Sequence, residues 1–368
     1  MTDHQPRRIA YFITPHGYGH AARAAAVMNA FYHTLPGIIF EIYTRVPVWF
    51  FNMSNEGAFN YHELLTDIGL VQASSMQENL PETVKRLDEF LPFNHELVQA
   101  LARQITEQSC EMVFCDVSPL GIAVAQAAGL PSILVENFTW DWIYEGYLAE
   151  EPGLAPHIAY LKEAFASAEL HIRTEPACDY SRPVNLVTQV VSRQPRNSIE
   201  TTRQRLGIPL EARVIMITMG GILTQYPFLP RLEKAADMVF LVPGGSDTYA
   251  KRGNLVVIPH HSNLYHPDLV AAADAMVGKL GYSTLAEAYA TGIPYAYIPR
   301  ERFPESLPMG QFARETWDAI ELSEARFFSG EWLDLLPEML SRPRRQPDEL
   351  NGADQIARWI LKKVQARE

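Results

Sequence analysis

Residues 9–23 read IAYFITPHGYGHAAR, and this stretch decides the fold. Its first five residues are apolar and predict a buried strand, while the residues after the turn carry apolar side chains at helical spacing. Gly17 and Gly19 occupy the turn between them. Glycine lets backbone N–H groups approach an anion closely, and a helix start adds a partial positive charge. The stretch therefore predicts an α/β unit that begins with a ligand-binding turn.

A similar arrangement occurs in the second half of the chain. Residues 279–284 read KLGYST; they follow an apolar run at 275–277 and open a predicted helix. Another glycine-rich turn, Gly220-Gly221, follows the apolar run 214–218. Backbone N–H groups from two such turns can converge on one pyrophosphate. We therefore expect the second half to bind the phosphates of a nucleotide.

Short apolar runs alternate with helix-length segments along the whole chain. The runs predicted as strands are 9–13, 38–43, 112–115 and 133–135, then 214–218, 238–242, 255–258, 275–277 and 295–298. Continuous apolar strands separated by helices are typical of parallel sheets covered on both faces. The predicted fold class is α/β, with two Rossmann-like, doubly wound parallel-sheet domains.

The domain boundary is expected near residue 190, because residues 181–197 are polar, contain prolines and precede a predicted helix. This gives an N-terminal domain, 1–190, and a second domain, 191–345. A proline-rich stretch at 341–347 then breaks the chain before an amphipathic helix. Residues 346–368 are therefore expected to form a C-terminal helix, which we place against the first domain.

Composition excludes several classes of protein. The 368 residues carry a formal net charge of −12, which would repel a nucleic-acid backbone. Three cysteines without metal-type spacing fit reduced thiols. No run of about 20 apolar residues predicts a membrane span, and no apolar signal region precedes the first strand. We expect a cytoplasmic protein that does not bind nucleic acid.

The first turn carries a candidate catalytic base. His20 lies near a helix start at the carboxyl end of a strand, where open α/β sheets bind ligands, and a neutral imidazole can accept a proton from a hydroxyl. Arg23, one turn on, is a candidate anion ligand, and Asp116, at the end of another strand, could orient the imidazole. The alternatives are that His20 and Asp116 merely cap helices and that Arg23 faces solvent. The dinucleotide fingerprint GxGxxG is not matched, so NAD chemistry is disfavoured.

The second turn offers phosphate and ribose ligands. Ser283 and Thr284 supply hydroxyls and N–H groups, Lys279 supplies positive charge, and Glu287 could accept hydrogen bonds from ribose hydroxyls. Residues 284–287 also match a capping box, in which Glu287 would fold back onto the backbone. Spacing does not decide between the two. Three histidines, at 260, 261 and 266, lack a recognised metal-ligand spacing, so we expect no metal there and favour a base-binding loop.

Several of these stretches resemble the GT-B glycosyltransferase superfamily, and most of all the glycosyltransferase-like N-terminal region of L-arabinokinases. They are residues 16–23, 115–119, 136–144 and 278–287, the last together with Pro299-Arg300. The resemblance implies two Rossmann-like domains facing a central cleft. Residues 1–190 would then form the acceptor side and residues 191–345 the nucleotide-sugar donor side.

The second turn also resembles the donor site of the GlcNAc transferase that makes the peptidoglycan lipid intermediate. That resemblance implies that Thr284 and Glu287 face the diphosphate and ribose of UDP. In the loop after the next strand this chain has Arg300 and Glu305 where that transferase has glutamines, which leaves the sugar open. Arabinokinases owe their kinase activity to a further domain, which is not found in this sequence, so no kinase activity is predicted.

The expected function is an inverting, metal-independent glycosyl transfer from a nucleotide diphosphate sugar to an acceptor hydroxyl, without a cofactor. His20 and Asp116 would be catalytic. The residues expected to bind substrate are His16, Gly17, Gly19, Arg23, Trp140, Asp141, Arg300 and Glu305. The residues expected to bind the nucleotide are Gly220, Gly221, His260, Lys279, Gly281, Tyr282, Ser283, Thr284 and Glu287. The aromatic residues around Trp140 would stack on an acceptor or, alternatively, pack in the core.

Two other functions fit the same pattern. One is a nucleotide-sugar hydrolase or 2-epimerase, in which water could replace the acceptor. The other is a non-catalytic nucleotide-sugar binding module, which would bind UDP without turnover.

Overall fold

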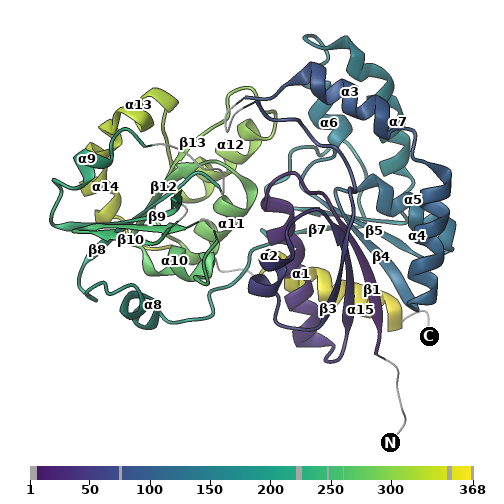
Figure 1. Ribbon diagram of the computed structural model, residues 1–368, viewed down its shortest axis with the longest axis horizontal. Helices are drawn as coiled ribbons and strands as arrows, with labels where there is room; N and C mark the ends of the chain where they lie inside the picture. The colour runs from purple at the N-terminus through teal and green to yellow at the C-terminus, as the bar shows by residue number, and fades with distance from the viewer. Residues whose placement is uncertain are drawn as a thin grey trace, which may run out of the picture. The chain divides into compact units, whose positions relative to one another are not determined.

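Two sheets of seven strands organise the structure, a computed structural model shown in Figure 1. It describes residues 6–73, 77–220, 226–246, 248–259, 261–345 and 350–365. The chain divides into two compact units. The first comprises Met1–Ser192, Phe303–Glu305 and Leu350–Glu368, and the second comprises Arg193–Arg302 and Ser306–Glu349.

The sheet of the first unit is parallel throughout. Its strands, in chain order, are β1 (Arg8–Ile13), β2 (Ile39–Thr44), β3 (Phe59–Glu63), β4 (Cys110–Asp116), β5 (Ser132–Glu136), β6 (Leu170–Thr174) and β7 (Leu186–Thr188). They lie in the order β3-β2-β1-β4-β5-β6-β7. The order reverses between β1 and β4, and open α/β sheets bind their ligands at such a reversal, beyond the carboxyl ends of the strands.

The sheet of the second unit repeats this topology. Its strands are β8 (Arg213–Thr218), β9 (Met238–Ser246), β10 (Ala250–Arg252), β11 (Leu255–Pro259), β12 (Ala275–Lys279), β13 (Tyr295–Ile298) and β14 (Ile320–Glu321). Their order is β10-β11-β9-β8-β12-β13-β14, and the edge strand β10 is antiparallel to β11. The reversal falls between β8 and β12. The predicted class, two doubly wound parallel sheets, is confirmed.

Helices connect the strands in both units. Those of the first unit are α1 (Gly19–Thr34), α2 (Val48–Ser54), α3 (Leu80–Phe90), α4 (His95–Glu107), α5 (Pro119–Ala128), α6 (Trp140–Glu145), α7 (Ala155–Ala166) and α15 (Gly352–Gln365), with a 3-10 turn at Pro152–Leu154. Those of the second are α8 (Ile199–Arg205), α9 (Leu229–Leu232), α10 (His266–Ala272), α11 (Tyr282–Thr291), α12 (Ser306–Trp317), α13 (Glu324–Ser329) and α14 (Leu336–Ser341), with a 3-10 turn at Glu331–Leu335. Within the described ranges, no helix is both long and apolar enough to span a bilayer.

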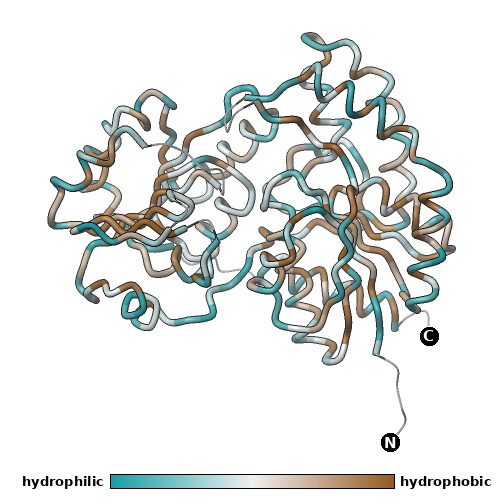
Figure 2. Tube along the Cα trace, viewed as in Figure 1, coloured by the Kyte–Doolittle hydropathy of each residue, from teal (hydrophilic) through white to brown (hydrophobic). Residues whose placement is uncertain are grey.

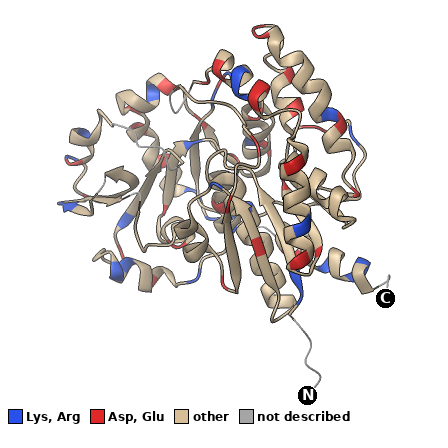
Figure 3. Cartoon of the chain, turned by 45° about the vertical axis from the view of Figure 1, so that its right-hand side comes forward, with Lys and Arg blue, Asp and Glu red and all other residues tan. Residues whose placement is uncertain are grey.

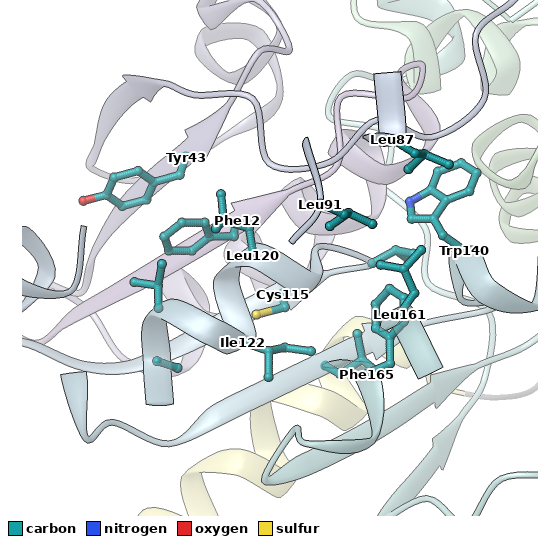
Figure 4. Packing of buried hydrophobic residues seen from close by; sticks show 14 of the residues in the cluster. Phe12, Tyr43, Leu87, Leu91, Cys115, Leu120, Ile122, Trp140, Leu161 and Phe165 are labelled. Atoms are coloured by element: carbon teal, nitrogen blue, oxygen red, sulfur yellow. The ribbon is translucent and has the colours of Figure 1, made fainter. Parts of the chain in front are cut away.

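Successive side chains of the strands alternate between the two faces of the first sheet, and each face carries a hydrophobic core. Phe12 points to a cluster formed with helices α3 to α7, and Figure 4 shows it among Cys115, Leu120 and Ile122. Tyr11, one residue earlier, points to the other cluster, which includes residues of α1 and α15. Successive side chains of a strand face opposite sides of a sheet, so both faces are buried.

Apolar residues therefore concentrate on the strands, where Figure 2 is mostly brown. Charged residues lie mainly on the helices and loops, with both signs interspersed (Figure 3). The buried exceptions include the charged residues at the carboxyl ends of β4 and β12. Asp116 is fully buried and Lys279 is 9% exposed. Buried charge at these strand ends marks them as candidate functional positions.

Candidate functional site

The first group of site residues lies at the carboxyl ends of β1 and β4. Ile13, the last residue of β1, pairs directly with Asp116, the last residue of β4. The turn after β1 leads into α1, whose second residue is His20. The neighbouring strand ends thus bring His20 and Asp116 together although 96 residues separate them, and His20 Nδ1 lies 2.9 Å from Asp116 Oδ1.

The backbone at both strand ends adopts unusual conformations. Gly17 has φ +75°, and a Cβ added there would meet nothing within 4 Å, so the turn is open on that side. Val117, immediately after Asp116, has φ +51° and is fully buried. A β-branched residue in this region is strained, and strain of this kind concentrates at functional sites.

Arg23 binds the same carboxylate from the next turn of α1. Its Nε donates to Asp116 Oδ2 at 2.8 Å and its Nη2 to Asp116 Oδ1 at 2.7 Å, a bidentate pair. Its Nη1 donates to Asn137 Oδ1 at 2.6 Å, and Asn137 Nδ2 donates to Glu305 Oε1 at 2.8 Å. Arg23 is 1% exposed. The guanidinium is thus an internal anchor of the His20 and Asp116 pair and does not face solvent.

These contacts favour the charged form of Asp116 and set the tautomer of a neutral His20 ring. Burial alone would raise the pKa of Asp116, but the charge and hydrogen bonds of Arg23, with a hydrogen bond from His20, hold it below its ordinary value. An ionised carboxylate only accepts hydrogen bonds, so the neutral His20 ring carries its proton on Nδ1. His20 Nε2 then holds the free lone pair. Neither residue acts as the helix cap, since Tyr18 is the N-cap of α1 and Ser118 that of α5.

Asp67 is a second buried acid in this region, and sequence reasoning missed it. It follows β3 and accepts a hydrogen bond of 2.6 Å from Thr14 Oγ1, in the turn after β1. Burial raises the pKa of Asp67 to about 8, against the smaller lowering effect of its hydrogen bonds, and the charge of Asp116 adds to the rise. At neutral pH its carboxyl is therefore mainly protonated. No sequence signal could have found it, because β3 lacks an apolar run and its loop lacks a motif.

His16 and the aromatic residues form a packed layer beside the pair. The rings of His16 and Trp140 lie 5.0 Å apart edge-on, and the rings of His20 and Phe138 lie 5.6 Å apart. Trp140 is 1% exposed. Of the two expectations for Trp140, core packing is therefore the one that fits the structure, because no ring face is open for a sugar.

The other residues expected to bind substrate are placed as follows. Asp141 is fully buried and ion-paired with Arg182, so it does not present its carboxylate to a ligand. Glu305 is 5% exposed and joins the Asn137 contact. Arg300 belongs to the second unit, where its backbone N–H donates to Ser306 Oγ at 3.1 Å. Gly19 is the first residue of α1.

The second group of site residues lies where the second sheet reverses its strand order. Gly278 is required in β12, because a Cβ there would lie 2.1 Å from the Thr218 carbonyl oxygen in β8. Gly220 has φ +70°, and a Cβ on it would lie 3.7 Å from Lys279 Nζ. The Lys279 ammonium thus lies beside the glycine turn after β8. Gly221 and His260 fall outside the described residues.

The start of α11 is open to an anion. Gly281 is its N-cap and makes no side-chain cap hydrogen bond, and a Cβ on Gly281 would meet nothing within 4 Å. Tyr282, Ser283 and Thr284 form that first turn, with Ser283 partly exposed. The N–H groups of a helix start carry a partial positive charge and, together with the Lys279 ammonium, suit a diphosphate.

The contacts of Glu287 agree neither with a capping box nor with an open ribose ligand. The capping box is absent, because α11 begins at Tyr282 and Thr284 lies inside the helix. The expectation of an open ribose ligand also needs correction, since Glu287 is 2% exposed and both of its oxygens bind side chains. These partners are Arg193 and His266. Burial would raise the pKa of Glu287, but the two partners outweigh it and hold that pKa below its ordinary value.

The described parts of the chain offer few ligands for a metal ion. No group of three or more His, Cys, Asp or Glu side chains there is arranged to hold one. The positive groups that the structure places at the two sites are side chains, Arg23 in the first unit and Lys279 in the second.

Comparison with known proteins gives relatives for nearly the whole chain, although no protein-family model matches it. It is 26% identical to an L-arabinokinase of Arabidopsis thaliana over 360 residues, which are 96% of this chain and 34% of that protein. The chain thus spans about a third of the length of this curated relative.

A shorter match concerns UDP-N-acetylglucosamine--N-acetylmuramyl-(pentapeptide) pyrophosphoryl-undecaprenol N-acetylglucosamine transferase of Moorella thermoacetica. It is 28% identical over 149 residues and covers 34% of this chain and 39% of that protein. Among solved structures, the spinosyn forosaminyltransferase SpnP superposes with a TM-score of 0.65 at 15% identity, covering 98% of this chain and 99% of its own. At that identity the likeness describes the fold.

Proposed function

We propose that this chain, whose fold is that of the GT-B glycosyltransferases, transfers a sugar from a nucleotide diphosphate sugar to an acceptor hydroxyl. One observation carries the proposal: the buried pair of His20 and Asp116, anchored by Arg23 at the strand ends where ligands bind. The name of the Moorella thermoacetica relative contains a UDP-sugar, which supports UDP as the nucleotide.

The first unit would supply the base. His20 Nε2 takes the proton of the acceptor hydroxyl, and the resulting imidazolium is stabilised by the ionised Asp116 through Nδ1–H. The acceptor oxygen then forms a bond to the anomeric carbon while the bond from that carbon to the diphosphate breaks. A single displacement of this kind inverts the configuration at the anomeric carbon.

The second unit would hold the leaving group. The diphosphate gains negative charge as the glycosidic bond breaks, and it meets the N–H groups at the start of α11 and the Lys279 ammonium. These groups supply the positive charge that a metal ion supplies in other transferases, which supports a metal-independent reaction. The 1–190 and 191–345 division into acceptor and donor sides is part of this proposal.

The test begins with nucleotide sugars that raise the melting temperature of the protein, since a ligand that binds the folded state stabilises it. With the best of these donors and a panel of hydroxyl acceptors, His20→Ala should lower kcat by about a hundredfold or more. The Kd for the nucleoside diphosphate should stay within about twofold, because that ligand binds the second unit.

His33→Ala is the matched control, since His33 forms an exposed pair with Glu56 on the surface of the first unit. It should leave both quantities unchanged. Equal losses of kcat and nucleotide affinity in His20→Ala would contradict the assignment of His20 as the base. Release of free sugar without any acceptor would identify a hydrolase, and binding without turnover on the whole panel would identify a binding module.

A further inference from the structure

Glu287 has little capacity left for a ligand. Its Oε1 accepts hydrogen bonds from Arg193 Nε at 2.9 Å and from Arg193 Nη2 at 2.6 Å, and its Oε2 lies 2.6 Å from His266 Nδ1. The side chain is 2% exposed. Three of the about four acceptor positions of the carboxylate are thus taken, so a ribose hydroxyl would have to reach the remaining one on a buried side chain or displace a partner.

Arg193 is held too firmly to be that displaced partner. It is 6% exposed, and its guanidinium lies 5.4 Å from the centre of the Tyr265 ring. Arg196 lies 4.3 Å from the same ring centre. Asp268, itself buried, accepts hydrogen bonds from the backbone N–H groups of Arg196 and Asn197 at 2.6 and 3.0 Å. The segment that carries Arg193 is thus fastened to the start of α10.

His266 is the accessible member of the cluster. It is the first residue of α10, in the region that follows the carboxyl end of β11, and its side chain is 28% exposed. The ionised Glu287 only accepts hydrogen bonds, so His266 in its neutral form carries its proton on Nδ1. The lone pair then lies on Nε2, on the other side of the ring from Glu287.

The position along α11 suits a ribose. Six residues separate Gly281, at the proposed diphosphate site, from Glu287, which is about 9 Å along a helix axis. A ribose follows the diphosphate in any nucleoside diphosphate, and acidic side chains of Rossmann-like units commonly bind its hydroxyls. In this chain the acidic side chain at that place is buried, and its hydrogen-bond partner His266 is the more exposed of the two.

We propose that His266, rather than Glu287, is the ribose ligand of this chain, with its Nε2 accepting a hydrogen bond from a ribose hydroxyl. Glu287 is then a positioning residue, which sets the tautomer and the orientation of the His266 ring. This inference rests on the proposed function, because it requires a nucleotide whose diphosphate binds at the start of α11. Its consequence is a preference for ribonucleotides over their deoxy analogues that depends on one imidazole.

The experiment measures the Kd of UDP, 2′-deoxy-UDP and 3′-deoxy-UDP by titration calorimetry. The wild-type protein should bind UDP about tenfold more tightly than the analogue that lacks the bonded hydroxyl. His266→Ala should weaken UDP by about the same factor and leave that analogue unchanged, so the preference disappears. Glu287 keeps Arg193 as a partner in this variant, so the fold should survive, which circular dichroism can verify.

His33→Ala, which removes an exposed histidine of another histidine–carboxylate pair, should keep the full preference. Glu287→Gln tests the positioning role: its amide keeps the shape but no longer fixes the ring, so the preference should shrink without vanishing.

A tenfold preference for UDP that persists in His266→Ala would overturn the inference and leave the proposed function intact. Equal binding of UDP and both analogues by the wild-type protein would have the same meaning. Failure of the wild-type protein to bind any nucleotide would reject the proposed function, and the inference with it.

Discussion

At the scale of single residues, two buried acids near the first sheet's carboxyl end respond to their surroundings in opposite ways. Arg23 and His20 stabilise the charged form of Asp116, whereas at Asp67 burial outweighs the hydrogen bonds and stabilises the neutral form. Environments that shift the pKa values of two acids in opposite directions allow one acid to stay charged and the other to stay protonated at the same pH. Asp116 therefore supports the imidazole, while Asp67 holds Thr14 without adding a second negative charge.

The first prediction concerns the pH dependence of stability. Folded Asp67 keeps its proton up to about pH 8, whereas in the unfolded chain an aspartate loses it near pH 4. The folded state therefore binds more protons between these values, and stability falls as pH rises through this window. The slope from one group is at most about 1.4 kcal/mol per pH unit.

Asp67→Asn removes this titration and keeps an amide of the same shape beside Thr14. Urea unfolding from pH 5 to pH 8 measures the free energy of unfolding of both proteins. The wild-type value should fall relative to that of the variant as the pH rises. Parallel stability curves for the two proteins would show that Asp67 does not hold a proton in the folded state.

At this scale, local signals in the sequence decided which contacts between residues could be predicted. His20 and Asp116 could be selected because each stands at the end of an apolar run, and the sheet brings such ends together. Arg193 and His266 could not be connected with Glu287, since their meeting depends on how the segment before α8 packs against α10 and α11. A spacing along the chain carries no information on such contacts.

At the scale of elements, the glycines of β12 and α11 have different roles although they are three residues apart. Gly278 allows β12 to approach β8, and Gly281 leaves space in front of the start of α11. The first role concerns packing within the sheet, and the second concerns access for a ligand.

The second prediction follows from this difference. Gly278→Ala should lower stability by about 1–3 kcal/mol, because the methyl group would overlap the Thr218 carbonyl oxygen and strands cannot move apart without loss. Gly281→Ala should fold with nearly unchanged stability, since its backbone is extended and its Cβ position is open. The same variant should bind UDP more weakly, because the methyl group occupies the space of the diphosphate.

Thermal unfolding and UDP calorimetry on both variants measure the two effects separately. Equal destabilisation by the two substitutions, or unimpaired UDP binding by Gly281→Ala, would contradict the assigned roles.

The predicted strands with continuous apolar runs all occur, because such runs must be buried on both faces of a sheet. The strands that the sequence did not predict lie toward the edges or are polar. β3 reads FNYHE, and in the three-residue β7 Val187 is 49% exposed. Edge strands are covered on fewer sides, so their composition differs little from that of a loop.

At the scale of the whole molecule, the first unit is assembled from distant parts of the chain. Helix α15 packs against α1, and its buried residues Ile356 and Ile360 join the core that includes Tyr11 (Figure 1). The segment 303–305 also belongs to this unit. Two continuous domains and a terminal helix were expected from the sequence. The place of segment 303–305 could not be expected, because it depends on contacts of Phe303 with His16 and Phe138.

The third prediction concerns this helix. Ile360→Asp should lower the stability of the first unit by about 3 kcal/mol or more, because it places an unpaired charge in the core. Arg358→Asp, on the exposed side of the same helix, should change stability by about 0.5 kcal/mol or less. Urea unfolding followed by tryptophan fluorescence compares the two, and similar midpoints would mean that α15 is not part of that core.

The membership of α15 in the first unit has a consequence for synthesis of the protein. Domains usually fold in order as the ribosome delivers them, the N-terminal one first. Here the second unit is fully delivered once residue 349 has emerged, while the first still lacks the helix that covers α1. The half of the protein that is translated first is therefore the half that matures last, and until then it exposes an apolar surface that a chaperone would recognise.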